Sequence, residues 1–203
     1  MTVTAIREIN RKKVSVEFDH QLTLVLDRGE LKRYDLREGS QVPDELPAEI
    51  EEQILRKRAA KYAMNLLIKR DYTAKELGDK LCRAGYTDDT AGYALEYVTS
   101  FGYINDAGYA RRYLETYSDR KSLRRMQADL RQKGISEETL SLALEEADCV
   151  EEKSVLHRYA EKKAASLDLA QDRDRQKFFR YLIGKGFSYG DAREALEELQ
   201  TEQ

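Results

Sequence analysis

Proline, cysteine and histidine are scarce in this chain of 203 residues, and long apolar runs are absent. Both prolines, Pro43 and Pro47, lie in the first quarter, so no proline interrupts a helix in the rest of the chain. Two cysteines and two histidines are too few for a disulfide framework or a typical four-ligand zinc site. We expect Cys82 and Cys149 to be small, partly buried apolar residues.

The apolar segments are too short to cross a membrane, which takes about 18 apolar residues, and the N-terminus lacks the apolar core of a signal peptide. We therefore expect a soluble cytoplasmic protein without membrane contact. Charge is dense but nearly balanced, with 35 Lys and Arg against 38 Asp and Glu. The 41% of apolar residues can fill a core, which argues against a disordered polyelectrolyte.

Residues 1–46 are predicted to form a small β-rich extension. Apolar and polar residues alternate there in short runs, which indicates two or three antiparallel strands. The stretch 29–36 fits either a short helix or a strand. Pro47, followed by several glutamates, is typical of a helix start, so we place a boundary after residue 46. The apolar members of the runs are Ile6, Ile9, Val14, Val16, Phe18, Leu22, Leu24 and Leu26.

The chain after Pro47 repeats itself three times. Each copy has a Tyr-Ala pair, two apolar residues spaced four apart, a glycine four residues later, and an Ala-Leu pair after that. The glycines are Gly85, Gly134 and Gly186, and the pairs begin at Tyr62, Tyr109 and Tyr159. The apolar residues ahead of the glycines mark one face of a helix; they are Leu77, Leu81, Met126, Leu130, Phe178 and Leu182.

Each offset shared by the repeats has a physical role in ending one helix and starting the next. The glycine can adopt the left-handed conformation that closes a helix, and the apolar residue after it can pack back on that helix. The hydroxyl residue that comes next, Thr87, Ser136 or Ser188, can cap the following helix. Thr73 with Glu76 forms a further capping-box pattern.

The repeat unit is therefore three helices. We predict modules at about 60–102, 106–148 and 152–200, which gives domains at 47–105, 106–149 and 150–203. Modules of this size are small for independent stability and should stack in a row. The predicted fold is mainly α, with three tandem three-helix repeats forming an elongated curved body behind the β-rich extension. The competing interpretation is one compact helical domain whose repeats are coincidental.

No catalytic constellation is apparent. His157 lies on a predicted helix and is expected to be structural or solvent-facing, and His20 lies in a predicted hairpin turn. A nucleophile usually needs a base placed beside it, and no such pair is indicated. The glycines Gly184, Gly186 and Gly190 depart from the dinucleotide-binding pattern and follow a helix rather than a strand. We expect no catalytic residue, no metal and no cofactor.

Basic residues gather in the middle module. Between residues 120 and 133 there are six Lys and Arg and one acid, Asp129. Arg120 with Arg124, and Lys121 with Arg125, would be like-charge pairs four apart on a helix, which favours an anionic partner. A solvated helix face balanced by neighbouring acids is the alternative, and the two stay open. The predicted contact residues are Arg111, Arg112, Arg120, Lys121, Arg124, Arg125, Arg131 and Lys133.

The third helix of the later modules carries the opposite charge. Residues 136–148 hold five acids and no base, and residues 189–199 are also acidic. A helix-turn-helix protein reads DNA with its last helix, which needs basic or amide side chains. The acidic third helices therefore argue against that mode of binding.

Three motifs within these repeats resemble a known family. The segments 101–113 (FGYINDAGYARRY), 130–136 (LRQKGIS) and 181–188 (YLIGKGFS), together with the triple repeat, resemble RecX, the bacterial regulatory protein of the RecA recombinase. The resemblance covers roughly residues 55–200, and the N-terminal extension is similar to that of longer RecX proteins of Gram-positive bacteria. It implies a non-enzymatic regulator of recombination and repair that binds RecA and its DNA filament and mainly inhibits ATP hydrolysis, filament growth and strand exchange.

Two other functions stay open beside this one. The first is an autonomous DNA-binding protein that competes with RecA for DNA, and the second is a helical scaffold for an unrelated partner. A net charge of -3 predicts only modest unaided affinity for DNA, since phosphate binding depends on displaced counterions. We expect a monomer whose main partner is RecA and whose direct contact with DNA is weak.

Overall fold

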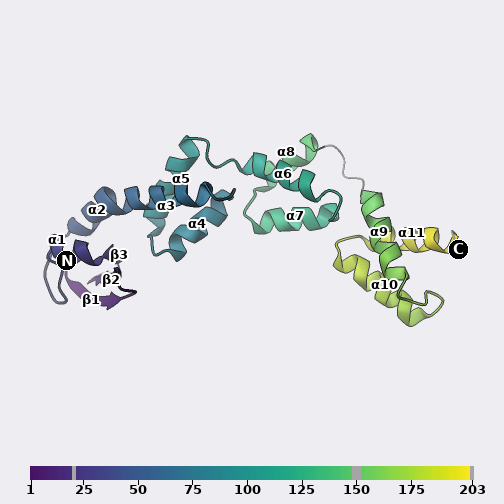
Figure 1. Cartoon of the computed structure of the whole chain (residues 1–203), viewed down its shortest axis with the longest axis horizontal. Coiled ribbons are helices and arrows are strands. Elements are labelled where there is room, and N and C mark those ends of the chain that lie inside the picture. Colours follow the sequence, from purple (N-terminus) through teal and green to yellow (C-terminus); the bar gives the residue numbers. More distant parts are fainter. Residues whose placement is uncertain (20–21, 148–151, 202–203) are drawn as a thin grey trace. The chain divides into compact units, whose positions relative to one another are not determined.

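The computed structural model describes residues 1–19, 22–147 and 152–201 (Figure 1). The chain divides into two compact units, Met1–Asn105 and Asp106–Gln203. The first contains the sheet and one three-helix repeat, and the second contains two such repeats. A mainly helical fold with a small strand-rich N-terminal part is therefore confirmed. No helix in the described residues is long and apolar enough to span a membrane.

The N-terminal part is a three-stranded antiparallel sheet of order β1-β2-β3. Its strands are β1 (Val3–Glu8), β2 (Lys13–Phe18) and β3 (Thr23–Asp27). The alternation predicted the buried face well, because Val14, Val16, Phe18, Leu24 and Leu26 are all buried. Stretch 29–36, which fitted two conformations, begins with the short helix α1 (Arg28–Arg33).

Ile9 lies outside the strands, in contrast to the prediction from the alternating pattern. It follows the end of β1 in the turn to β2, where its amide donates a hydrogen bond to the Lys13 carbonyl, and its side chain is 52% exposed. The expected turn position of His20 lies outside the described residues.

A continuous helical segment leads from the sheet into the first repeat. It consists of α2 (Leu46–Ile50), the π-helical turn η2 (Glu51–Leu55) and α3 (Arg56–Leu67). Pro47 occupies the first turn, as its sequence context predicted. Ile50 and Leu55 complete the core of the sheet, so the extension packs on the helix that follows it. The boundary after residue 46 stays a prediction.

Two side chains of this helical segment, Arg58 and Glu51, bind neighbouring elements. Arg58 on α3 forms ion pairs with Asp27 at 3.3 Å and with Glu30 of α1. Glu51 in the π-helical turn accepts hydrogen bonds from the hydroxyls of Thr90, at 2.6 Å, and Thr87. The long helix is thereby joined both to the end of the sheet and to the start of the third helix of its repeat.

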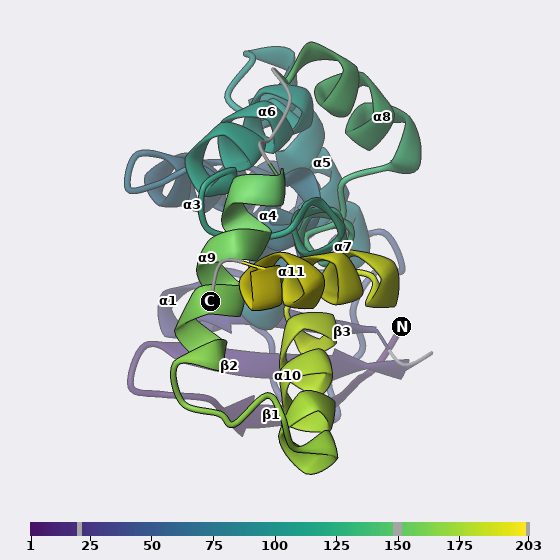
Figure 2. The same cartoon turned by 90° about the vertical axis from the view of Figure 1, so that its right-hand side faces the viewer.

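Each three-helix repeat has its own buried core. Repeat 1 adds α4 (Ala74–Arg83) and α5 (Asp88–Ser100) to α3; repeat 2 contains α6 (Asp106–Tyr117), α7 (Leu123–Gln132) and α8 (Glu137–Glu146); repeat 3 contains α9 (Glu152–Ala164), α10 (Asp172–Gly184) and α11 (Tyr189–Thr201). The helices α9, α10 and α11 pack on one another, as Figure 2 shows. The six apolar residues predicted to face inward ahead of the glycines are fully buried: Leu77, Leu81, Met126, Leu130, Phe178 and Leu182.

The turn between second and third helices has one geometry in all three repeats. The glycine has a positive φ of 91°, 86° or 98°, and the residue after it donates its amide to the carbonyl five residues earlier. The predicted hydroxyl caps also form: Thr87, Ser136 and Ser188 each accept a hydrogen bond from an amide in the first turn of the next helix. The local sequence therefore determines both helix ends.

Cys82 differs from the expectation, because it is exposed rather than partly buried. Leu77 and Leu81 occupy the inward face of α4, and the next position along a helix is rotated away from that face. Cys149 lies outside the described residues, and so does the expected boundary between residues 149 and 150. The three domain limits therefore remain predictions.

Within the second unit, the glycine turn of repeat 3 contacts the start of α7. Ser122 is fully buried there; its hydroxyl caps α7 and donates a hydrogen bond to the Lys185 carbonyl at 2.9 Å. A Cβ atom on Gly186 would overlap the Ser122 hydroxyl and lie 3.3 Å from the Arg125 amide nitrogen. This glycine is needed for its backbone angle and also for the close approach of two repeats.

Replacing Gly186 with Ala should lower the free energy of unfolding by roughly 1 to 3 kcal/mol, because the residue has φ +98° and no room for a methyl group. Gly184→Ala is the matched control, since this glycine is helical and has open space around it. It should be neutral or stabilising by up to about 1 kcal/mol. Urea denaturation measures both, and equal midpoints for the two variants would contradict this account.

Candidate functional site

The eight basic residues predicted from charge all lie in repeat 2. Arg111 and Arg112 belong to α6, Arg120 and Lys121 to the turn after it, Arg124, Arg125 and Arg131 to α7, and Lys133 to the end of α7. The expected like-charge pairs four apart on a helix do not form, because α7 begins only at Leu123 and Ser122 caps it. Arg120 and Lys121 therefore lie in the turn between α6 and α7 and do not share a helix with Arg124 and Arg125.

Lys121 forms the centre of a hydrogen-bonded cluster within the repeat. Its ammonium group donates to Tyr113 Oη at 2.7 Å and to Asp129 Oδ2 at 2.8 Å, and it lies 4.4 Å from the centre of the Tyr117 ring. Tyr113 also donates to Asp129, at 2.9 Å. Asp129 is only 14% exposed, so its charge is largely compensated by these neighbours. Lys121 therefore stabilises the turn, and its charge is largely used within the repeat.

The pKa values in this cluster follow from burial and hydrogen bonding. Burial alone would raise the pKa of the Asp129 carboxyl, but hydrogen bonds from Lys121 and Tyr113 outweigh it, and the pKa is lowered. Burial would lower the pKa of the Lys121 ammonium, and its bonds to Asp129 and Tyr113 raise it instead. Burial raises the pKa of the Tyr113 hydroxyl. The charged forms of Lys121 and Asp129 therefore stabilise each other.

Acids of the same repeat compensate several other predicted contact residues. Arg125 pairs with Asp129 at 3.2 Å, and Arg111 pairs with Glu146 of α8 at 3.2 Å. Arg131 binds both carboxylate oxygens of Glu137. Between residues 106 and 146 the sequence holds eight Lys and Arg and eight Asp and Glu. The alternative of a face balanced by neighbouring acids thus describes part of this surface.

These surface pairs are weak enough for an anionic partner to replace. Arg111 and Arg131 are about half exposed, and exposed ion pairs contribute only about 0 to 1 kcal/mol. Arg120 is 71% exposed, with Asp119 as its nearest carboxylate at 3.5 Å, and Arg124 is exposed as well. Lys133 lies over the Tyr109 ring at 5.5 Å. Arg120 and Arg124 are therefore the strongest candidates for contact among the eight.

Arg120 also lines a cleft that sequence reasoning missed. This inter-repeat cleft measures about 380 Å³ and is lined by Asp119, Arg120, Arg158, Tyr159 and Lys162. Arg158 and Lys162 come from α9 in repeat 3, one helical turn apart on the same face. Their spacing was visible in the sequence, but nothing local indicated that α9 packs beside the turn after α6.

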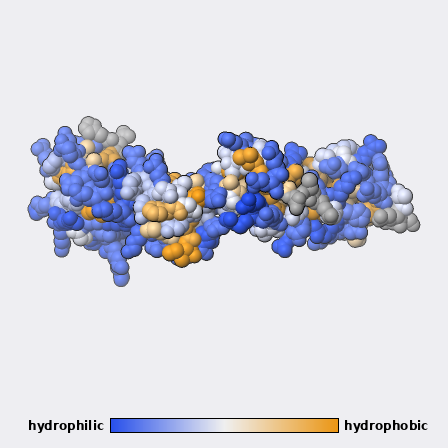
Figure 3. All heavy atoms as spheres, turned by 90° about the horizontal axis from the view of Figure 1, so that it is seen from above, coloured by the Kyte–Doolittle hydropathy of each residue, from blue (hydrophilic) through white to orange (hydrophobic). Residues whose placement is uncertain are grey.

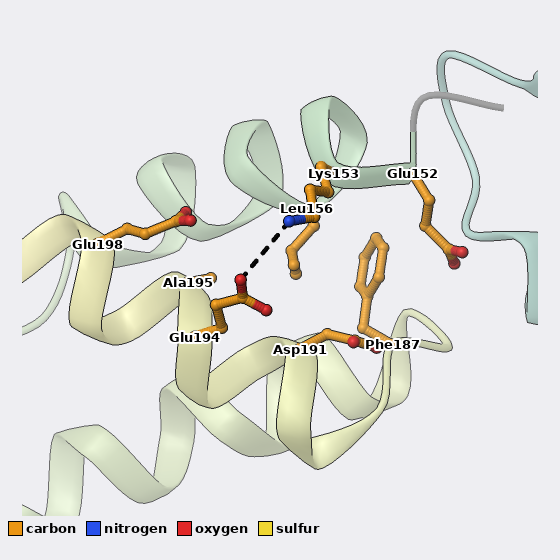
Figure 4. A pocket seen from close by; sticks show the side chains of 8 residues that line it. All are labelled: Glu152, Lys153, Leu156, Phe187, Asp191, Glu194, Ala195 and Glu198. Atoms are coloured by element: carbon orange, nitrogen blue, oxygen red, sulfur yellow. Dashed lines mark ion pairs between the residues drawn. The ribbon is translucent and has the colours of Figure 1, made fainter.

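A second pocket lies between α9 and α11 in repeat 3 (Figure 4). Its volume is about 220 Å³, and Leu156, Phe187 and Ala195 provide its apolar lining. Lys153 lies 3.6 Å from Glu194 across the opening. Acids of α11, the third helix of repeat 3, therefore line this pocket and not the inter-repeat cleft. The acids that line the pocket are Glu152, Asp191, Glu194 and Glu198.

Exposed apolar side chains gather in the first unit. Ile68 is 82% exposed, and it lines a pocket of about 240 Å³ with Met64, Leu67 and Tyr103. Phe101 stacks on Tyr103 with ring centres 6.0 Å apart. Figure 3 shows hydrophobic side chains as an orange area over repeat 1, while much of the remaining visible surface is hydrophilic.

Metal-ligating side chains are scattered in the part of the chain that the structure describes. Across residues 1–19, 22–147 and 152–201, no group of three or more His, Cys, Asp and Glu side chains is arranged to hold a metal ion. His157 is partly exposed and lies 3.6 Å from Glu161 on its own helix.

Three family models match the chain in order along its helical part. They describe the first, second and third three-helix domains of RecX and match residues 59–97, 105–144 and 151–196. A regulatory protein RecX of Clostridium perfringens is 28% identical over 193 residues, covering 93% of this chain and 91% of the relative. A regulatory protein RecX of Thermus thermophilus is 33% identical over 144 residues, covering 71% of this chain and 94% of the relative.

Solved structures show the same likeness. A crystal structure of a regulatory protein RecX covers 97% of this chain and 98% of its own, with a TM-score of 0.63 and 19% identity, which is evidence for the fold alone. RecX from Lactobacillus salivarius covers 72% of this chain and 97% of its own, with a TM-score of 0.61 and 25% identity.

The Asp129→Asn variant should lose about 1 to 3 kcal/mol of unfolding free energy at neutral pH, because it removes the charge that accepts from Lys121 and Tyr113. The folded-state pKa of Asp129 is lowered, so its contribution is present above the ordinary value near 3.9 and is lost as pH falls through the folded-state pKa. Urea denaturation at pH 7 and at about pH 3 should therefore show a difference from wild type that narrows in acid.

Glu138→Gln is the matched control for this variant. Glu138 is an exposed acid in the first turn of α8, and its replacement should change stability by less than about 0.5 kcal/mol. A deficit for Asp129→Asn that is no larger than that of the control, or one that grows in acid, would refute the assigned role.

Proposed function

Because the chain belongs to the RecX family, we propose that it binds the RecA recombinase and its filament on DNA and inhibits ATP hydrolysis, filament growth and strand exchange. The observation that carries this proposal is the match of all three repeats, in order, to the three RecX domains. The named relatives are regulatory proteins, so we infer that this chain acts by binding and not by catalysis. In this proposal the protein acts in the cytoplasm, where it binds RecA as a monomer.

The contact surface in this proposal is the cationic side of repeat 2. Arg120, which is 71% exposed, and the exposed Arg124 provide charges on this surface, with Arg125 beside them, and Lys121 holds the turn that positions Arg120. Arg111 and Arg131 can exchange their exposed carboxylate partners for those of another protein at little cost. Arg112 and Lys133 extend the same surface.

Autonomous competition for DNA is the second candidate, and the charge balance of repeat 2 weighs against it. Affinity for DNA at physiological salt depends on many phosphate contacts that release counterions. Eight acids offset eight bases between residues 106 and 146, so tight binding without RecA is not expected. Nanomolar, strongly salt-dependent binding in the absence of RecA would favour this candidate instead.

The double variant Arg120→Glu with Arg124→Glu should inhibit RecA poorly. We expect the concentration that halves RecA ATPase activity on single-stranded DNA to rise at least about tenfold, which corresponds to about 1.4 kcal/mol of lost binding. The reason is that two exposed attractive charges become repulsive, while the Lys121 cluster stays intact. The helical circular dichroism spectrum should match that of wild type.

The control reverses two exposed lysines of the first unit, Lys32 and Lys57, which changes total charge by the same amount. It should inhibit as wild type does. Equal inhibition by both double variants would refute the assigned surface, whereas a wild-type protein that neither binds nor inhibits RecA would refute the function itself. Inhibition at ratios far below one per RecA would indicate action at filament ends and not along the groove.

A further inference from the structure

The inter-repeat cleft brings together positive charges that come from different repeats. Arg120 extends from the turn after α6, while Arg158 and Lys162 lie on α9. Asp119 is the one acid among the residues lining it. Two further lysines lie close by: Lys185 is 5.5 Å from the centre of the Tyr159 ring, and Lys163 is 5.5 Å from that of Tyr181.

Backbone contacts hold this cleft in shape, and Asp119 offsets part of its charge through an exposed ion pair with Arg120 at 3.5 Å. The Tyr159 hydroxyl donates to the Arg120 carbonyl at 2.8 Å, and the Arg158 guanidinium donates to the Asp119 carbonyl. Both acceptors are uncharged, so Arg158 keeps its full charge and most of its donors for a ligand. The repeats are joined beside the cleft by the Ser122 to Lys185 hydrogen bond and by the Leu123 amide, which donates to Glu152 at 3.2 Å.

The composition of the cleft favours phosphate over carboxylate. A single carboxylate is satisfied by one arginine fork, whereas three cations around one opening suit a polyanion with successive charges. A cationic groove with an aromatic wall is how many proteins follow the backbone of a single strand. The third helix of repeat 3, α11, is acidic, which disfavours its entry into a duplex groove.

We propose that the inter-repeat cleft binds the phosphodiester backbone of single-stranded DNA. Arg120 and Arg158 donate from their guanidinium groups, and Lys162 contributes a point charge. This inference rests on the proposed function, because DNA within the RecA filament is the polyanion that the protein meets. The cleft adds a modest contact of its own beside the contact with RecA.

Fluorescence anisotropy with a labelled oligo-dT at about 50 mM salt tests the cleft with the full-length chain. Arg120→Gln with Lys162→Gln should weaken binding about tenfold. The slope of log K against log salt is negative and should become shallower by about 1.4, since each lost single-strand contact removes about 0.7 from its magnitude. The control, Lys153→Gln with Arg193→Gln, removes two cations of the same repeat that pair with Glu194 and Glu197. It should bind as wild type does.

Tyr159→Phe tests whether the Tyr159 hydroxyl acts by positioning Arg120 or by contacting DNA itself. It keeps the ring but removes the hydrogen bond to the Arg120 carbonyl, so binding should weaken about two- to threefold with an unchanged salt slope. A shallower salt dependence would show that Tyr159 does not act through position alone and would contradict the geometry described for the cleft.

Binding to RecA alone, measured without DNA, distinguishes the two proposals. If wild type binds RecA but the cleft variant holds oligo-dT as tightly as the control does, the cleft proposal is overturned and the proposed function stands. If the cleft variant loses oligo-dT while wild type does not bind RecA, the proposed function fails and the phosphate site stands. Wild-type protein that binds no oligo-dT at low salt also overturns the cleft.

Discussion

The rest of the helical structure depends on one turn, in which a left-handed glycine closes a helix and a hydroxyl two residues later caps the next. The turn satisfies backbone groups that would otherwise be left unpaired at two helix ends. In the second unit it also fixes the side chains around it. The lysine before the glycine lies over the first tyrosine of its own repeat, as Lys133 does on Tyr109 and Lys185 does on Tyr159. One local geometry thus sets both the fold of a repeat and the placement of cations beside tyrosines.

Features that depend on neighbouring residues could be predicted from the sequence. The strands, the helix ends and the inward faces follow from alternation, glycine position and capping, which all act within a few residues. Features that depend on packing could not. Nothing in the spacing indicated that Lys121 would pair with Asp129 across a turn, or that Arg158 would lie beside Arg120. Cys82 is a different case, because its exposure follows from the predicted inward face of α4, on which Leu77 and Leu81 lie.

The near balance of charge in the whole chain also holds within repeat 2, where opposite charges pair with one another. Acids of α8 pair with bases of α6 and α7, so opposite charges cancel within one repeat as well as between surfaces. What is left for a partner is a small set of exposed cations at and near one turn, where Lys121 binds Asp129 and the Arg120 carbonyl accepts a hydrogen bond from Tyr159. A protein built in this way can meet an anionic surface without binding every polyanion tightly.

The N-terminal sheet is best understood as an end cap of the repeat array. Repeat proteins need terminal units whose outer face is polar, because a terminal repeat otherwise leaves its apolar side in water. Here the sheet covers Ile50 and Leu55 on the helix that leads into repeat 1, and both are almost completely buried. A fragment that began at Pro47 would expose this pair, so we expect the extension and the first repeat to unfold together.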